Sequence, residues 1–250
     1  MSGVPRRAPT RRIERASEEP AYVLHTHPWR ETSLILDVFS RHHGRLALVA
    51  KGAKRPTSQL RTVLLGFQPF SASWSGRGEV RTLTRAEWSG GVAPLAGLPL
   101  LCGFYFNELL VRLLPREDGH EALFDAYHAT VVELGGLAHG TAADVEPLLR
   151  RFELALLREL GHLPPLDRES DSGAALHAER SYRVDPRHGV LADAGPGSHA
   201  GALLQAIERG DWQQAGVARV AKSLMRELLH YHLGEQGLRT RQLLIDLHQL

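Results

Sequence analysis

Short runs of apolar and β-branched residues alternate with polar ones in the first third of the chain. Each run is bounded by polar, Gly- or Pro-containing turns, such as the one at Gly44 and the tight Gly76-Arg77-Gly78 sequence. Alternation of this kind is typical of half-buried strands. Five strands are predicted, in the runs AYVLHTH, TSLILDVFS, RLALVAK, VLLGFQPFSASWSG and EVRTLTRAEW. Five strands in about 70 residues indicate a small β-barrel, of which the OB-fold is the commonest kind; the periodicity alone also allows an SH3-like barrel.

Beyond Gly90-Gly91 the apolar residues recur every three to four positions, which is the period of an amphipathic helix. The segment 162–197 is polar and contains one predicted hairpin, SYRVDPRHGVLAD. The spacing predicts helices over residues 98–114, 121–134, about 144–161 with Asp144 as N-cap, about 198–210, 213–233, and from about 240.

The predicted fold class is therefore α+β, with an all-β N-terminal OB-fold barrel, an all-α C-terminal helical domain and a small hairpin insertion. Residues 1–19 are polar and basic and offer almost nothing to bury, so we expect a disordered tail there. The predicted domains are this tail, a barrel over 20–90 and a helical domain over 91–250, with the hairpin and loop region at about 162–197.

Charge divides the chain into two unequal parts. Residues 1–90 hold 15 basic and 7 acidic side chains, a net charge of +8, whereas residues 91–250 hold 15 basic and 21 acidic ones, a net charge of −6. The overall charge of +2 conceals this division. A strongly basic half indicates a polyanionic partner, and we expect the barrel to bind it.

Composition excludes several classes of protein. With 43% apolar residues the chain can bury a core, so global disorder is excluded. Its single cysteine, Cys102, permits neither an intramolecular disulfide nor a cysteine-based zinc site, and indicates a reducing compartment. No apolar stretch follows the N-terminal arginines as in a secretory signal, and Asn107, Glu108 and Arg112 interrupt the most apolar segment. We therefore expect a cytoplasmic protein without a membrane span.

The strongest local feature is the basic sequence KGAKRPTSQLR at residues 51–61, directly after a predicted strand. Further arginines at 30, 45, 77, 81 and 85 add charge to the barrel. An exposed aromatic residue beside basic ones can stack an unpaired base. We favour Trp29 for this role because it lies in the polar turn HPWRE, whereas most other barrel aromatics are expected in the core. The predicted nucleic-acid-binding residues are Trp29, Arg30, Lys51, Lys54, Arg55, Arg61 and Arg77.

Motifs for catalysis or metal binding are missing from the sequence. It contains no HExxH, CxxC, GxxxxGK[ST] or GxSxG pattern. The histidine pairs 25/27, 42/43 and 230/232 lack the third and fourth ligand of a zinc site at a recognisable spacing, so we expect structural or exposed histidines. Cys102 lies in the apolar run LPLLCGFYF and is expected to be buried and protonated. No catalytic residue, metal or cofactor is predicted.

Several short motifs occur in order along the barrel and the helical part. The barrel carries Arg30-Glu31-Thr32-Ser33, the basic loop with Ser58 and Leu60, and Gln68-Pro69-Phe70. The helical part carries FELALLRELGHLPPLD and AKSLMRELLHYHLGEQGLRTRQLL. In this order the motifs resemble the RecO family of bacterial DNA repair and recombination mediators, and the resemblance covers roughly residues 20 to 250. Thr240 stands where the family usually has Ser.

This resemblance implies a set of activities and partners. It implies binding to single- and double-stranded DNA, annealing of complementary strands, and help in loading RecA onto DNA coated by single-stranded-DNA-binding protein (SSB). It further implies association with RecR, contact with the acidic, hydrophobic C-terminal tail of SSB, and a bacterial, nucleoid-associated location. For the tail contact the candidate residues are Arg112, Lys222, Arg226, Leu224 and Leu228; ordinary charges at the rim of a packed helix are the alternative.

One departure from the family concerns zinc. Many members carry four cysteines after the "P-x-L-D" segment, whereas this chain has Glu169 and Ser172 where the first pair would stand. We therefore expect no zinc, and a hairpin that is held by packing. Two other interpretations stay open at this point: an OB-fold RNA-binding factor, because a barrel with a basic loop does not distinguish DNA from RNA, and a metal-dependent nucleic-acid enzyme that uses the histidines.

Overall fold

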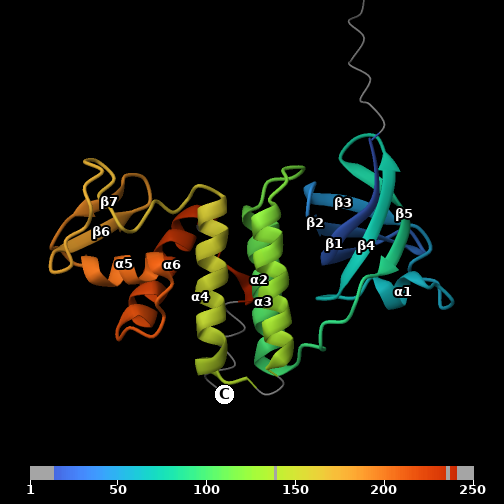
Figure 1. Cartoon of the computed structure of the whole chain (residues 1–250). Coiled ribbons are helices and arrows are strands. Elements are labelled where there is room, and N and C mark those ends of the chain that lie inside the picture. Colours follow the sequence, from blue (N-terminus) through green and yellow to red (C-terminus); the bar gives the residue numbers. More distant parts are fainter. Residues whose placement is uncertain (1–13, 138–139, 235–236, 241–250) are drawn as a thin grey trace, which may run out of the picture. The chain divides into compact units, whose positions relative to one another are not determined.

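The computed structural model describes residues 14–137, 140–234 and 237–240, which divide into two compact units. The barrel unit holds the described residues up to Gly91 together with Pro115–Gly119. The helical unit holds Val92–Leu114 and the described residues from His120 onward. The predicted α+β class, with a barrel followed by helices and a small hairpin, is confirmed (Figure 1).

Five strands close into a barrel in the order β1-β2-β3-β5-β4. All neighbouring strands are antiparallel except β3 and β5, which run parallel. The first strand pairs with β4 through its N-terminal half and with β2 through its C-terminal half, so a single long strand belongs to both sides of the OB-like barrel. The elements are β1 (Glu14–Trp29), β2 (Ser33–Ser40), β3 (Gly44–Ala50), α1 (Leu60–Val63), β4 (Pro69–Gly76) and β5 (Val80–Trp88).

Alternate residues of the strands fill the barrel. Leu36 and Val38 of β2 are fully buried, as are Leu48 of β3 and Phe70 of β4, and the indole of Trp74 is only 1% exposed. This alternation is the pattern that the sequence displays, and burying it in one closed barrel leaves few strand edges open to solvent.

The barrel begins earlier than the sequence suggested. The prediction of a disordered tail through residue 19 is wrong for residues 14–19, because Glu14 pairs with Gly76 and Ala16 with Trp74 in the ladder to β4. The polar sequence ERASEEP conceals this strand because its side chains are mostly exposed and only Ala16 packs against the core. Residues 1–13 lie outside the described residues.

The fourth predicted strand is also shorter than expected, since part of its run forms α1 and the turn before Pro69.

Five helices and a three-stranded sheet make up the described part of the helical unit. Helix α4 packs against α2, α3 and α6, and α6 packs against α5 (Figure 1). The elements are α2 (Gly97–Leu113), α3 (Glu121–Gly136), α4 (Ala142–Glu159), β6 (Ser181–Asp185), β7 (Gly189–Ala192), β8 (His199–Ala200), α5 (Gly201–Arg209) and α6 (Val217–Leu233).

Three helix starts differ from the sequence prediction. Helix α6 begins at Val217, four residues after the predicted start at residue 213. The N-cap of α4 is Thr141 and not Asp144, whose carboxylate instead accepts hydrogen bonds from the Thr141 backbone N–H and hydroxyl at 2.8 and 2.7 Å. Helix α5 starts at Gly201 because the two residues before it pair with β6. The helix predicted from about residue 240 lies almost wholly outside the described residues.

Segment Pro115–Gly119 follows α2 in the chain but packs against the barrel. Its Glu117 N–H donates to the carbonyl of Arg45 at 2.9 Å, and Arg116 forms a parallel bridge with Arg45. The segment thus covers the start of β3, where the ladder to β5 has not yet begun. Gly44 makes this approach possible: a Cβ there would lie 1.7 Å from the backbone oxygen of Asp118.

Side chains of this segment also pair with charges of the barrel. Arg81, whose side chain is 6% exposed, pairs with Glu117 at 3.2 Å and with Glu14 at 2.6 Å. Arg116 pairs with the buried carboxylate of Asp37 at 3.2 Å. Since a buried charge is costly unless it is paired, these contacts make the segment part of the barrel's structure.

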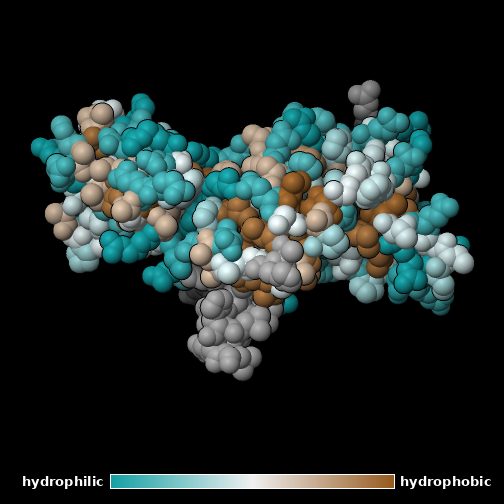
Figure 2. Space-filling view, turned by 60° about the horizontal axis from the view of Figure 1, so that its bottom comes forward, coloured by the Kyte–Doolittle hydropathy of each residue, from teal (hydrophilic) through white to brown (hydrophobic). Residues whose placement is uncertain are grey.

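The surface of both units is mostly hydrophilic on the face drawn in Figure 2, with hydrophobic areas between the polar ones. The exposed large apolar side chains are Trp29, Leu65, Val80 and Trp88 in the barrel unit and Phe104, Val132 and Tyr231 in the helical unit. Tyr231 is 44% exposed and accepts a hydrogen bond from Arg187 at 2.8 Å, so it lies at the surface of α6 and not among its buried residues.

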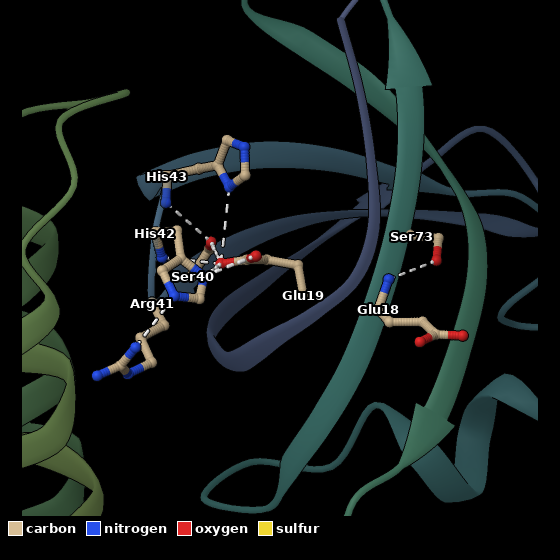
Figure 3. Close-up of polar contacts among 7 residues, drawn as sticks. All are labelled: Glu18, Glu19, Ser40, Arg41, His42, His43 and Ser73. Atoms are coloured by element: carbon tan, nitrogen blue, oxygen red, sulfur yellow. Dashed lines mark hydrogen bonds and ion pairs between the residues drawn. The ribbon is translucent and has the colours of Figure 1, made fainter.

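A buried carboxylate anchors the turn between β2 and β3 (Figure 3). The carboxylate of Glu19 on β1 accepts hydrogen bonds from the Ser40 hydroxyl at 2.7 Å and from the His42 backbone N–H at 2.8 Å, and it lies 3.0 Å from His42 Nδ1. His43 Nδ1 lies 3.6 Å away. Burial alone would raise the pKa of Glu19, but the hydrogen bonds from His42 and Ser40 outweigh it and hold the pKa below its usual value.

Replacing Gly44 with Ala should destabilise the protein by at least about 3 kcal/mol, because the new methyl group would overlap the Asp118 carbonyl and the residue would be held at a left-handed φ of +64°. Gly52→Ala is the matched control. Gly52 has a similar φ of +71° but only ordinary contacts, so it should lose just about 1–2 kcal/mol. Denaturant unfolding measures both values, and equal losses would show that the segment does not pack closely on Gly44.

Replacing Glu19 with Gln should reduce the acid sensitivity of the fold. A carboxyl group whose pKa is lowered by folding stabilises the protein above its unfolded pKa of about 4.3, and this stabilisation is lost as the pH falls through the folded value. The free energy of unfolding of the native chain should therefore fall more steeply below about pH 5 than that of Glu19→Gln. Parallel slopes in denaturant titrations from neutral pH to about pH 3 would contradict this role.

Candidate nucleic-acid interface

The basic loop after β3 is tied to the barrel by its backbone. Ala53 is buried at its centre, and the N–H of Lys54 donates to the carbonyl of Thr32 in the β1–β2 turn at 2.8 Å. The side chains of Lys51, Lys54 and Arg55 remain exposed. The loop is therefore a fixed support for exposed cations, placed beside a turn some twenty residues earlier in the chain.

The loop and that turn together line a depression of about 630 Å³ in the barrel surface. Trp29 and Arg30 from the turn and Lys51 and Arg55 from the loop all line it. Trp29 is 44% exposed, and the Arg30 guanidinium lies 5.9 Å from the centroid of its ring. The structure thus brings together four of the seven predicted nucleic-acid-binding residues, including the aromatic one.

The other three predicted residues lie outside this depression. Lys54 is in the same loop, Arg61 is on α1 and Arg77 is in the turn between β4 and β5. All three side chains are exposed. They could extend a binding surface but do not take part in the depression itself.

Three other arginines of the barrel are paired with carboxylates. Arg45 pairs with Asp37 at 3.5 Å and Arg85 pairs with Glu87 at 2.6 Å, while Arg81 is buried between two glutamates. Burial lowers the pKa of Arg45, and Arg116 lowers it further against the opposing effect of Asp37. By contrast, among the described residues Arg30, Lys51, Lys54 and Arg55 form no ion pair. The charge of these four side chains is therefore available to a ligand at the depression and its loop.

The aromatic residues divide as expected between core and surface. Phe67, Phe70 and Trp74 are buried in the barrel. Trp29 and Trp88 are exposed, at 44% and 59%, and only Trp29 lines the depression. Its position agrees with a stacking role.

In the helical unit, α4 and α6 line a groove of about 540 Å³. Its apolar surface is supplied by leucines and one tyrosine, and basic side chains surround it. The apolar residues are Tyr105, Leu149, Leu229, Leu233 and Leu238, and the basic ones are Arg150, Arg219, Lys222 and Arg226.

This groove contains two of the five predicted partner-binding residues, Lys222 and Arg226. Leu224 and Leu228 do not line the groove; they are 1% and 0% exposed and belong to the core between helices. Leu229 and Leu233 line the groove, although Leu229 is itself only 4% exposed. Arg112 does not line the groove either; its guanidinium donates to the Leu233 carbonyl at 3.1 Å near the end of α6.

Two groove cations are paired within the protein and two are not. Arg150 pairs with Glu153 at 2.9 Å, and this carboxylate, 1% exposed, also accepts a hydrogen bond from the Tyr105 hydroxyl. Lys222 pairs with Glu146 at 3.0 Å. Arg219 and Arg226 form no ion pair with any described residue. Sequence reasoning missed Arg219, although its spacing of three and seven residues from Lys222 and Arg226 puts it on the same helix face.

A zinc site does not fit the residues of the hairpin region. Ser172 donates its hydroxyl to Glu169 at 2.7 Å, and Ser170 exchanges backbone and side-chain hydrogen bonds with Val190 of β7, each of 2.8 Å. Tyr182 of β6 and Val190 of β7 are fully buried. Hydrogen bonds and packing thus hold the region. No group of three or more His, Cys, Asp or Glu side chains among the described residues is placed to hold a metal ion.

The single cysteine lies in helix α2. Cys102 is buried, and burial raises the pKa of its thiol to about 11, as expected for an unreactive core residue. Of the helices that the structure describes, none is both long and apolar enough to cross a membrane.

Two family models and many known proteins match this chain. The model described as "Recombination protein O N terminal" matches residues 15–92, and "Recombination protein O C terminal" matches residues 97–242. The DNA repair protein RecO of Cupriavidus pinatubonensis is 51% identical over 255 residues, which cover 100% of this chain and 86% of that protein. The proteins of the same name from Ralstonia nicotianae and Aromatoleum aromaticum are 53% and 48% identical and cover 97% and 95% of this chain and 89% and 98% of their own lengths.

Proposed function

Because the chain belongs to the RecO family of DNA repair proteins, we propose that it is a non-enzymatic recombination mediator that binds single- and double-stranded DNA through its barrel. In this proposal it anneals complementary strands and helps to load RecA onto SSB-coated DNA together with RecR. Such work belongs at the chromosome, so the proposal includes a location at the bacterial nucleoid.

The observation that carries the DNA-binding proposal is the depression between the β1–β2 turn and the basic loop. Its three cations, Arg30, Lys51 and Arg55, form no ion pair with any described residue and suit the phosphates of a nucleic-acid backbone. Trp29 offers a ring beside them for an unpaired base, as in other OB-folds that bind single strands. Phosphate contacts and stacking are largely independent of sequence, which suits a protein that must act on any damaged region.

Annealing follows from the same surface without a catalytic group. Two complementary strands repel each other through their phosphates, and cations bound to one strand lower that repulsion when the second approaches. Base pairing then proceeds without any covalent bond being made or broken. A fixed set of cations supplies this screening locally, where the strands meet.

Replacing Arg30, Lys51 and Arg55 together with Ala should weaken single-stranded DNA binding and flatten its dependence on salt, by about one unit of log–log slope for each lost phosphate contact. Trp29→Ala should weaken binding of single strands more than that of duplex, by about 1–3 kcal/mol for one stacked base. Fluorescence anisotropy at several salt concentrations measures both effects.

Arg85→Ala is the matched control, because Arg85 is exposed on the same barrel but paired with Glu87. A second set, Lys54, Arg61 and Arg77, tests whether the DNA extends beyond the depression. An unchanged slope in the first variant would place the DNA elsewhere. Competition with RNA of equal length completes the test, since a strong preference for RNA would contradict a role on DNA.

For the SSB tail we propose the groove between α4 and α6. A tail that is both acidic and hydrophobic needs an apolar surface with cations beside it, and the groove combines four leucines and Tyr105 with Arg150, Arg219, Lys222 and Arg226. Leu229 and Leu233 take the place that Leu224 and Leu228 held in the sequence prediction. Arg219 and Arg226 should contribute most, because among the described residues no carboxylate neutralises them.

Replacing Arg219 and Arg226 with Ala should weaken binding of an SSB tail peptide at least about tenfold, since each removes a charge-assisted contact of roughly 1 kcal/mol or more. DNA binding by the barrel should not change. Anisotropy of the labelled peptide measures the first effect, and Arg209→Ala, which removes a cation of α5 outside the groove, is the control. Undiminished peptide binding would remove the groove from the proposal.

A further inference from the structure

The cations of the groove differ in how much of their charge a ligand can use. Arg219, Lys222 and Arg226 follow one another at spacings of three and four residues along α6, so they share one face of the helix. Only Lys222 has a carboxylate partner among the described residues. Its Nζ lies 3.0 Å from Glu146 Oε1, with side chains 66% and 34% exposed.

We propose that Glu146 competes with an acidic peptide for Lys222 and so limits the affinity of the groove for that peptide. This inference rests on the proposed function of the groove as a peptide site. Glu146 does not itself line the groove, so it acts on the ligand through Lys222 and through its own charge.

The competition follows from the exchange of partners. When a peptide carboxylate reaches Lys222, it displaces Glu146 as the partner of the ammonium group. The ion pair gained with the peptide is about as stable as the ion pair lost with Glu146. Glu146 is then left close to an acidic ligand, and like charges repel. Lys222 therefore contributes little net affinity, whereas Arg219 and Arg226 gain a partner without losing one.

The size of the effect follows from the exposure of the pair. Exposed ion pairs are weak, so removing Glu146 should strengthen binding of an acidic peptide by roughly two- to fivefold at low salt. The gain should shrink at high salt, because the charges are screened.

Glu146→Gln tests the proposal in the full chain, with a peptide rich in aspartate and ending in apolar residues as the probe. Glu133→Gln is the matched control. Glu133 pairs with Arg151 across α3 and α4, both side chains are about half exposed, and neither lines the groove. Both variants change the net charge equally, so tighter binding by Glu146→Gln alone is the expected result. The same peptide with asparagine at each aspartate should bind all three proteins alike.

A double-mutant cycle with Lys222→Met adds a measurement that does not depend on the net charge of the protein. Replacing Lys222 should cost little affinity in the native chain but at least about threefold in Glu146→Gln, where the ammonium group is free to meet the peptide. Equal losses in the two backgrounds, or equal affinities of the Glu146→Gln and Glu133→Gln proteins, would overturn the proposal.

The outcome also separates this inference from the groove assignment. If the peptide binds and depends on Arg219 and Arg226 but not on Glu146, the groove is the peptide site and the competition is wrong. If Arg219 and Arg226 have no effect on the peptide, the groove assignment fails and the competition fails with it. Unfolding curves of all variants check that each protein is folded, as expected for exposed positions.

Discussion

Burying an arginine requires a carboxylate beside it, and this requirement decides where the chain can bind an anion. In the barrel Arg45 and Arg81 lie below the surface and use Asp37, Glu14 and Glu117 as partners. These arginines are therefore neutralised by carboxylates of the barrel unit, and they add little to the positive charge that a ligand meets. The exposed cations at the β1–β2 turn and in the loop after β3 form no ion pair with any described residue, so they remain available to a ligand.

The same requirement explains why Pro115–Gly119 belongs with the barrel. Arg81 and Asp37 each receive a partner from this segment, and the backbone of Gly44 lets the segment come within contact distance of β3. Residues 14–91 alone would leave the barrel without these partners. A barrel fragment that ended near residue 90 would therefore be a less stable object than the barrel in the whole chain.

Periodicity predicted most of the fold because burial in a barrel or bundle acts on every second or every third to fourth residue. Periodicity does not reveal a segment that is attached to the fold through main-chain hydrogen bonds and not through buried side chains. Residues 14–19 pair with β4 through main-chain hydrogen bonds while their side chains stay polar, so no alternation of apolar residues marks them. The N-cap of α4 shows the same limit, since Thr141 and Asp144 are both good capping residues and only their mutual hydrogen bonds decide between them.

The sequence indicated which kinds of residue form the candidate sites, but not which of those residues lie together in the fold. The basic loop is visible in the sequence, yet its meeting with Trp29 and Arg30 depends on the hydrogen bond from Lys54 to Thr32, which only the fold reveals. On α6 the sequence indicated the cations, but the two leucines predicted beside them, Leu224 and Leu228, are buried in the core. Where leucines lie on several faces of a helix, their spacing does not show which of them face the core.

The helical half carries a net charge of −6, yet the proposed ligand of its groove is acidic. These facts are compatible because charges in physiological salt act over about 8 Å, so a ligand responds to the side chains around it and not to the total. Around the groove four cations gather, and the two acidic side chains nearest to them, Glu146 and Glu153, are occupied by Lys222 and Arg150. Affinity for an acidic peptide thus depends on a balance between a few ion pairs. A single internal carboxylate can shift that balance, which is why net charge, taken over a whole domain, predicts the partner of the barrel better than that of the groove.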